Sequence, residues 1–263
     1  MRGNQTFALG VGYHWGFFTV QDSCFAERLG DLIDLTVNER AALARLEERT
    51  RDLRRGATLL RENDPLAELY ILQRGMAMSY VLLDDGSRQI LRFLFPGDVL
   101  AAAALVYRDS PETIVALTDC TVCPFDRSLV GGLVVDHPRL AAILMVVGQI
   151  EKISLTDRLA ALGRTSAKAR IAALLLEIRN RMRMADKGIG ATFTLGLTQE
   201  EVGDATGLTA VHVNRMLRQL EDDGLIAREN GRVTLVSEGQ LARAANYIDR
   251  FDGLDLRWLP SAR

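Results

Sequence analysis

The chain of 263 residues is long enough for two domains, each with a hydrophobic core of its own. Its composition, 48% hydrophobic and 25% charged with a formal net charge of −2, is that of a globular protein and excludes a chain that is basic throughout. It has no apolar run of about 18 residues that would predict a membrane span, and its start lacks the apolar segment of a signal peptide, so we expect a cytoplasmic protein. The three cysteines do not form the pattern of a disulfide framework.

Residues 1–30 form an N-terminal extension to which we assign no fold. Its aromatic residues are Tyr13, Trp15, Phe17 and Phe18. We expect this segment either to pack those side chains onto the body of the protein or to be partly disordered. A ligand role for His14 is the alternative.

Residues 31–136 combine one helix with many short strands. Apolar residues at helical spacing predict a helix over 32–46, and Thr36 with Glu39 three residues later forms a capping box. Short runs rich in β-formers then alternate with turns that contain Gly, Asp and Pro, which favours a β-sandwich or jelly-roll barrel. The predicted strands are 58–60, 69–72, 76–83, 89–95, 113–117 and 120–125. From Asp126 the pattern becomes helical again.

Pro138 is expected to open a long helix that runs to about Leu162. Its apolar residues at 140, 143, 144, 147 and 150 follow one another in steps of three and four, which suits the seam of a dimer. A helix buried in its own domain has the same spacing, so periodicity leaves both interpretations open. Gly163 is expected to form a hinge before a further amphipathic helix over 166–184.

Residues 197–236 have the pattern of a winged helix-turn-helix. A capping box opens a first short helix, a glycine ends it, a second cap opens a second helix, and a hairpin turn follows. The residues that carry these signals are Thr198 with Glu201, Gly207, Thr209, Gly224 and the pair Asn230-Gly231. In this arrangement the second helix enters the major groove of DNA. A terminal helix is expected over 241–251.

The order of these elements resembles the Crp/Fnr family of bacterial transcription regulators over 32–236, most specifically in LTQEEVGDATGLTAVHVNRMLRQLEDDGLI, LYILQRG, DDGSRQI and FPGDVL. The resemblance implies an α+β fold with four parts after the extension. They are a double-stranded β-helix or jelly-roll domain of the cyclic-nucleotide-binding type (31–136), a long dimerisation helix (137–163), a winged helix-turn-helix DNA-binding domain (164–236) and a C-terminal helix and tail (237–263). The resemblance also implies a homodimer that binds a near-palindromic operator in double-stranded DNA and contacts RNA polymerase.

The effector site is where this sequence departs from the family. Cyclic-nucleotide binders carry a Gly-Glu pair and then an Arg-Ser pair, which hold the ribose and the phosphate. Matched by position, the first pair falls on Ala101-Ala102 and the second on Glu112-Thr113, and a carboxylate repels a phosphate. The long-helix position that contacts the base in such binders is Thr156, which is compatible but not sufficient. We therefore expect no response to cAMP and leave an unidentified effector open.

Iron–sulfur members of the family need four cysteine thiolates, three of them near the N-terminus, where this chain has only Cys24. Cys120 and Cys123 have the spacing of a CxxC, but residues three apart in a strand point to opposite faces. We expect buried thiols there; a redox switch is the first alternative and a metal or cluster the second. We also expect no haem, because no histidine lies in a clear pocket segment that could supply an axial ligand; the histidines are His14, His137 and His212.

In family terms, bases are read from the first turns of the second helix, here by Thr209, Val211, His212, Asn214 and Arg215. Arg215 matches the arginine that family members use for base readout, and a guanidinium can bond guanine bidentately. Val211 stands where many relatives have Glu, and it either touches a thymine methyl or packs inward. Candidate phosphate contacts are Thr198, Arg218, Arg228 and Arg232.

Together these patterns predict a dimeric, sequence-specific DNA-binding regulator. The alternative is a redox or small-molecule sensor that acts mainly through protein contacts, with the helix-turn-helix as an interaction module. An enzyme is not expected, because the sequence has no nucleotide-binding glycine motif, zinc-protease motif or catalytic triad order.

Overall fold

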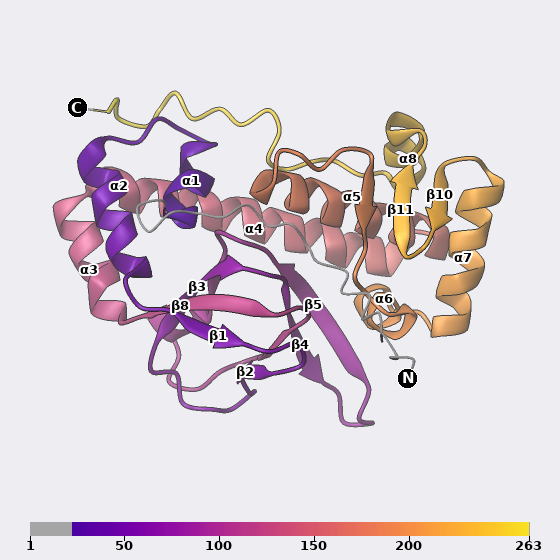
Figure 1. The fold of residues 1–263 in the computed structure, drawn as a ribbon, viewed down its shortest axis with the longest axis horizontal. Helices are drawn as coiled ribbons and strands as arrows, with labels where there is room; N and C mark the ends of the chain where they lie inside the picture. Colours follow the sequence, from indigo (N-terminus) through magenta and orange to yellow (C-terminus); the bar gives the residue numbers. More distant parts are fainter. Residues whose placement is uncertain (1–22, 263) are drawn as a thin grey trace, which may run out of the picture.

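The computed structural model describes residues 23–262. The aromatic residues of the predicted N-terminal extension, and His14, lie outside these residues. Along the described chain a β-roll of short strands is followed by the long helix α4 (Pro138–Arg164) and then by a C-terminal domain that runs from α5 to α8. Figure 1 shows that α4 runs alongside both the β-roll and the C-terminal domain.

Two antiparallel sheets of four strands build the β-roll (Figure 1), which confirms the predicted jelly-roll architecture. One sheet has the strand order β1-β8-β3-β6 and the other β2-β7-β4-β5. The strands are β1 (Arg51–Leu53), β2 (Thr58–Leu60), β3 (Leu69–Arg74), β4 (Ala77–Leu82), β5 (Arg88–Leu94), β6 (Val99–Leu100), β7 (Thr113–Ala116) and β8 (Cys120–Phe125). Their alternation places one set of side chains between the sheets.

The turn between β3 and β4 requires a glycine. Gly75 has a φ of 93°, which L side chains rarely adopt, and a Cβ there would lie 2.5 Å from the backbone oxygen of Asp119. The turns at Gly86 and Gly97 also have positive φ, as their place in the predicted turns implies.

Short helices close one end of the β-roll: α1 (Cys24–Gly30), α2 (Val37–Ala44), the 3-10 helix η1 (Arg45–Glu47) and α3 (Arg127–Asp136). The capping box of Thr36 and Glu39 is present, so α2 begins at Val37 and the prediction of a helix from residue 32 was wrong at its start. A capping residue is the last extended residue before a helix, and apolar spacing alone did not locate it.

The long helix α4 shows that the predicted hinge at Gly163 is wrong, and it shows what the apolar row at 140–150 packs against. Gly163 lies inside the helix, which continues to Arg164, so the chain turns at Thr165 rather than at a glycine hinge. The apolar residues Leu140, Ile143 and Ile150 are buried in this chain's own interior, and Leu144 and Val147 are half-buried against it, so the row at 140–150 packs on the chain's own core. A different apolar row of α4, with Met145 69% and Leu159 71% exposed, faces away from the β-roll.

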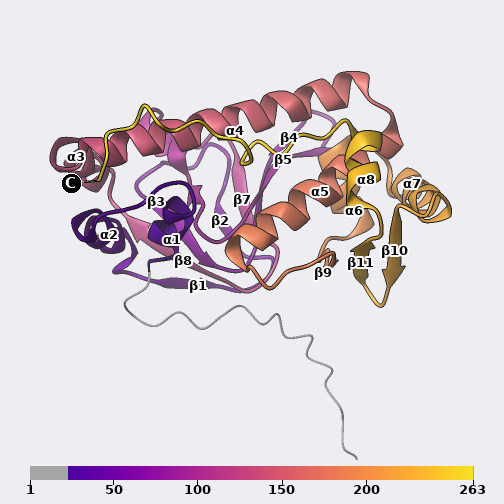
Figure 2. The same cartoon turned by 90° about the horizontal axis from the view of Figure 1, so that it is seen from above.

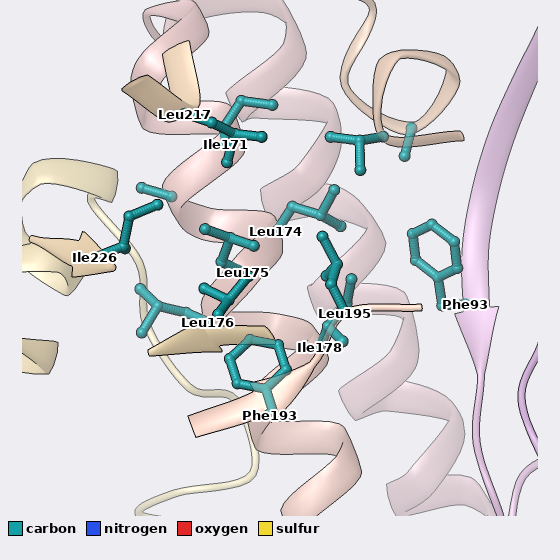
Figure 3. Close-up of a cluster of buried hydrophobic side chains, with 14 of the residues drawn as sticks. Phe93, Ile171, Leu174, Leu175, Leu176, Ile178, Phe193, Leu195, Leu217 and Ile226 are labelled. Carbon is teal, nitrogen blue, oxygen red and sulfur yellow. The ribbon is translucent and has the colours of Figure 1, made fainter. Parts of the chain in front are cut away.

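The C-terminal domain packs around α5 (Ala167–Ala185). Its other elements are β9 (Thr192–Thr194), α6 (Gln199–Thr206), α7 (Ala210–Asp222), β10 (Ile226–Glu229), β11 (Arg232–Leu235) and α8 (Glu238–Ala245). The strands form a three-stranded sheet in the order β10-β11-β9. Figure 3 shows Leu174, Leu175 and Ile178 of α5 in the middle of a cluster that Phe193 closes from below and Phe93 of β5 meets from the side. The core of this domain is therefore continuous with the outer face of the β-roll.

The chain after α8 does not continue as the predicted helix over 241–251. Helix α8 ends at Ala245, and Asn246 takes the left-handed conformation that ends helices. The C-terminal segment (residues 246–262) then runs beside α4 towards α1 and α2, as Figures 1 and 2 both show. Arg250 pairs with Asp157 of α4 through two hydrogen bonds of 2.5 and 2.9 Å, and Arg139 of α4 donates to the backbone oxygen of Pro260.

No helix in the part of the chain that the structure describes combines the length and the apolar character that crossing a membrane requires.

Candidate nucleic-acid interface

The helix-turn-helix is built by local signals at α6 and α7. The Thr198 hydroxyl accepts from the backbone N–H of Glu201, whose carboxylate accepts from the backbone N–H of Thr198, as the capping box predicts. Gly207 ends α6 in the left-handed conformation with a φ of 66°. Gly203 brings the turn close to α6, because a Cβ on it would lie 2.4 Å from the backbone oxygen of Leu208.

Helix α7 has one buried and one exposed face. Thr209 caps it by accepting from the backbone N–H of His212. The buried face consists of Val213, Met216, Leu217 and Leu220, which pack into the core of the C-terminal domain. On the opposite face His212, Arg215 and Arg218 are exposed, and Asn214 lies at its edge, half-buried.

Val211 is 82% exposed, which excludes the alternative that it packs inward. Arg215 has no hydrogen bond or ion pair with any residue that the structure describes, so its guanidinium is available. The structure therefore places Thr209, Val211, His212 and Arg215 on the open side of α7 in its first two turns, where base readout by a recognition helix takes place.

The predicted phosphate contacts fall into two groups. Thr198, Arg218 and Arg232 are exposed around α7, Arg232 at the start of β11. Arg228 of β10 instead pairs with Glu221 of α7 at 2.6 Å and holds the wing against the helix. The Arg228 guanidinium in turn lowers the pKa of the Glu221 carboxyl. Arg228 thus has an intramolecular partner that the sequence did not reveal.

The wing turns at Asn230 and Gly231, both with positive φ, 50° and 75°. Two successive residues of this kind form the tight hairpin turn that the Asn-Gly pair predicts.

Of the degenerate effector pair Ala101-Ala102, Ala101 belongs to the apolar cluster between the two sheets. Ala101 is buried with a φ of 56°, a conformation in which glycine is favoured, and it opens the short helix η2 (Ala102–Leu105). Side chains between the two sheets form an apolar cluster whose larger members include Leu53, Leu59, Leu60, Tyr70, Leu72, Leu94, Leu100 and Ile114. Near it the Ser79 hydroxyl of β4 is buried and has no hydrogen-bond partner among the described residues.

Glu112 is paired with a cation rather than open to a ligand. Arg92 of β5 lies 3.4 Å from Glu112 and 3.3 Å from Glu151 of α4, so one guanidinium serves two carboxylates. Thr113 is buried and its hydroxyl accepts from the backbone N–H of Glu62, whereas Thr156 is exposed and donates to the backbone oxygen of Lys152. The cation beside Glu112, Arg92, is thus already paired with two carboxylates of this chain.

The two cysteines of the CxxC spacing face different parts of the interior. Cys120 lies in the cluster between the sheets, whereas Cys123 lies with Cys24 in the cluster beneath α1 and α2. Burial raises the pKa of all three thiols, that of Cys123 to about 12. The predicted opposite orientation is confirmed. In residues 23–262 no group of three or more His, Cys, Asp or Glu side chains could hold a metal ion.

Sequence reasoning missed the contacts that join the helix-turn-helix to the β-roll. Arg88 of β5 pairs with Asp204 of α6 at 2.7 Å, and the Gln89 amide donates to the backbone oxygen of Asp204. More than a hundred residues separate these partners, so no local pattern reveals them. Gly203 was detectable in principle, because a small residue is needed where two helices meet across a short turn.

Comparisons with known proteins agree with this geometry. Residues 50–137 match the cyclic nucleotide-binding domain and residues 169–244 match the Crp-like helix-turn-helix domain. The nitrogen fixation regulation protein FixK of Bradyrhizobium diazoefficiens is 32% identical over 72% of this chain and 79% of its own length. The fumarate and nitrate reduction regulatory protein of Escherichia coli K12 is 27% identical over 82% of this chain and 86% of its own.

Among solved structures, FixK2 from Bradyrhizobium japonicum has a TM-score of 0.67 at 27% identity and covers 74% of this chain and 96% of its own. A transcriptional regulator of the CRP family from Thermus thermophilus has a TM-score of 0.61 at 27% identity over 74% of this chain and 96% of its own. The chain has an exposed recognition helix, and α4 joins that part to the β-roll. By these comparisons and this geometry, the chain belongs to the Crp/Fnr family of DNA-binding transcription regulators.

Proposed function

We propose that this protein acts as a homodimer that binds a near-palindromic operator, with one α7 in each half-site. The support for a dimer is the exposed apolar row of α4, which includes Met145, Leu155 and Leu159. They lie ten and four residues apart, at places of the three- and four-residue repeat by which one helix packs along a twin, with Gly148 and Lys152 at the two places between Met145 and Leu155. Two-fold symmetry of the protein calls for a palindromic site with half-sites about one helical turn apart.

Base readout is assigned to Thr209, Val211, His212, Asn214 and Arg215. The exposed Arg215, which has no partner in the described chain, is the observation that carries this assignment. A guanidinium that no side chain holds can bond guanine O6 and N7, and the exposed Val211 can contact a thymine methyl. Thr198, Arg218 and Arg232 would contact phosphates, and Arg228 would do so only by releasing Glu221.

The signal is not a cyclic nucleotide in this proposal. The support is the pairing of Arg92 with Glu112 and Glu151 and the apolar filling between the sheets. The division into a sensor domain, a dimerisation helix and a DNA-binding domain, contact with RNA polymerase and a cytoplasmic location are further parts of the proposal, which rest on the family relationship.

Selection of bound duplexes from a random pool, followed by a salt titration of the best one, tests the function. We expect a palindromic consensus and an observed affinity that falls linearly on a log–log plot against salt concentration. Sedimentation of the free protein should give a dimer, and Leu159→Asp, which places a charge in the exposed row, should give a monomer with weaker operator binding. Failure to enrich any sequence would favour the alternative of a sensor that acts through protein contacts.

A further inference from the structure

A cavity of about 340 Å³ lies at the junction of α4 with the C-terminal domain. The last turns of α4, one side of α5, the end of α6 and the start of the C-terminal segment enclose it. This volume is within the range of small-molecule sites in proteins. None of the residues assigned above to DNA contact or to the degenerate effector site lines it.

The lining combines apolar surface with an excess of positive charge. Five arginines and three carboxylates line the cavity, and Asp98 behind the lining pairs with one of the arginines, Arg181, which leaves a formal excess of one positive charge. The apolar part includes Leu162, Ala173, Leu174, Ile248 and Phe251. A positively charged and apolar lining selects an anion that has an apolar body, and it repels a metal cation.

Three of the arginines carry buried nitrogens that have no hydrogen-bond acceptor among residues 23–262: Arg158 Nη2, Arg170 Nε and Arg181 Nε. Other nitrogens of the same groups are anchored: Arg158 Nη1 on the backbone oxygen of Leu91, Arg170 Nη1 on that of Thr206 and Arg181 Nη2 on the carboxylate of Asp98. Arg158 Nη2 lies 3.6 Å from a carboxylate oxygen of Glu177, an ion pair without a hydrogen bond. Buried donors without acceptors are costly, so an acceptor bound beside these guanidinium groups would be stabilising.

We propose that this cavity binds a small organic acid, with its anionic group on Arg158 and Arg170 and its apolar body against Leu162, Leu174 and Phe251. The ligand would contact α4 and the C-terminal domain at once. Because Arg170 also holds the end of α6 through Thr206, occupancy would bias the position of the helix-turn-helix relative to the dimerisation helix. The input of this regulator is then at the junction and not in the β-roll.

Calorimetric titration of the full chain without DNA tests the site, with 1-naphthoate as the anionic probe and 1-naphthamide as its neutral counterpart. We expect one molecule of 1-naphthoate per chain, with a dissociation constant on the order of 1 mM or below for an unoptimised ligand of this size. The neutral amide should bind at least about tenfold more weakly, because it does not pair with the guanidinium groups.

Arg170→Gln should weaken 1-naphthoate binding by about tenfold, while the matched Arg183→Gln, an exposed position on the same helix outside the cavity, should leave it unchanged. Ala173→Leu fills the cavity without removing an arginine and should also weaken binding, so the test holds even if Arg170→Gln does not fold. No saturable binding of 1-naphthoate at millimolar concentration, or equal binding by wild type and Ala173→Leu, overturns the proposal. The assay contains no DNA, so its result is independent of the assigned base readout.

Discussion

Arg88 Nη2 in the β-roll lies 2.7 Å from Asp204 Oδ2 on α6, the first helix of the helix-turn-helix. The Arg88 guanidinium also lies over the ring of Tyr80, 5.2 Å from its centroid. Both ionised side chains are 28% exposed, so the pair is partly shielded from solvent. The β-roll therefore contacts the DNA-reading unit directly, and not only through α4.

A double-mutant cycle of Arg88→Ala and Asp204→Ala should give a coupling energy of up to about 1 kcal/mol in urea unfolding, the upper range for a partly exposed pair. The pair Arg49–Glu68, with Arg49 60% exposed, provides the comparison and should couple more weakly. A zero value for Arg88 and Asp204 would mean that the contact does not hold the two parts together in solution.

Arg215→Ala should lose about 1–3 kcal/mol of discrimination at one base pair of each half-site. Arg218→Ala, on the same helix, should instead weaken binding to all sequences alike and reduce the salt slope by about 1. Competition binding against single-base variants of the selected operator measures both effects. Unchanged site preference in Arg215→Ala would remove that residue from base readout.

Gly203→Ala should destabilise the C-terminal domain by about 1–3 kcal/mol, because its Cβ would meet the backbone oxygen of Leu208 at 2.4 Å and force α6 away from the turn. Gly163→Ala in α4 meets no atom within 4 Å and should be neutral or stabilising by up to about 1 kcal/mol. Thermal unfolding of the two variants compares them, and equal melting temperatures would contradict the close approach.

Glu151→Gln should make the protein less sensitive to pH. Burial raises the pKa of the Glu151 carboxyl above its ordinary value, against the opposing effect of Arg92. The folded state then binds this proton more tightly than the unfolded state, so stability falls as pH rises from the unfolded pKa through the raised folded pKa. Urea unfolding across this window should show a flatter profile for Glu151→Gln; a steeper one would contradict the direction of the shift.

The three thiols should resist iodoacetamide in the native protein and react once it is unfolded in urea. All three are buried, and burial raises the pKa of each, so little thiolate forms at neutral pH. Mass spectrometry counts the adducts. Rapid labelling of native Cys120 or Cys123 would restore the redox-switch alternative.

Local signals explain what could be predicted from the sequence. The capping boxes at Thr36 and Thr198, the turn at Asn230-Gly231 and the alternation of the strands depend on residues within a few positions of one another. Family-specific spacing then identified the β-roll, the long helix and the winged helix-turn-helix in their correct order. For the same reason the start of α2 and the end of α8 were misjudged, because apolar spacing does not mark where a helix begins or stops.

The sequence by itself thus determined the elements, their order and the family, since these follow from short-range chemistry. Only the tertiary structure decided which side of α4 is buried, that Val211 is exposed, that Arg92 neutralises Glu112, and that Arg228 is held by Glu221. Each of these depends on which segments pack against one another, and residues with the same local pattern can be buried or exposed according to that packing. The cavity at the end of α4 also depends on this packing, because α4 and α5 enclose it together with the end of α6 and the C-terminal segment, which come later in the chain.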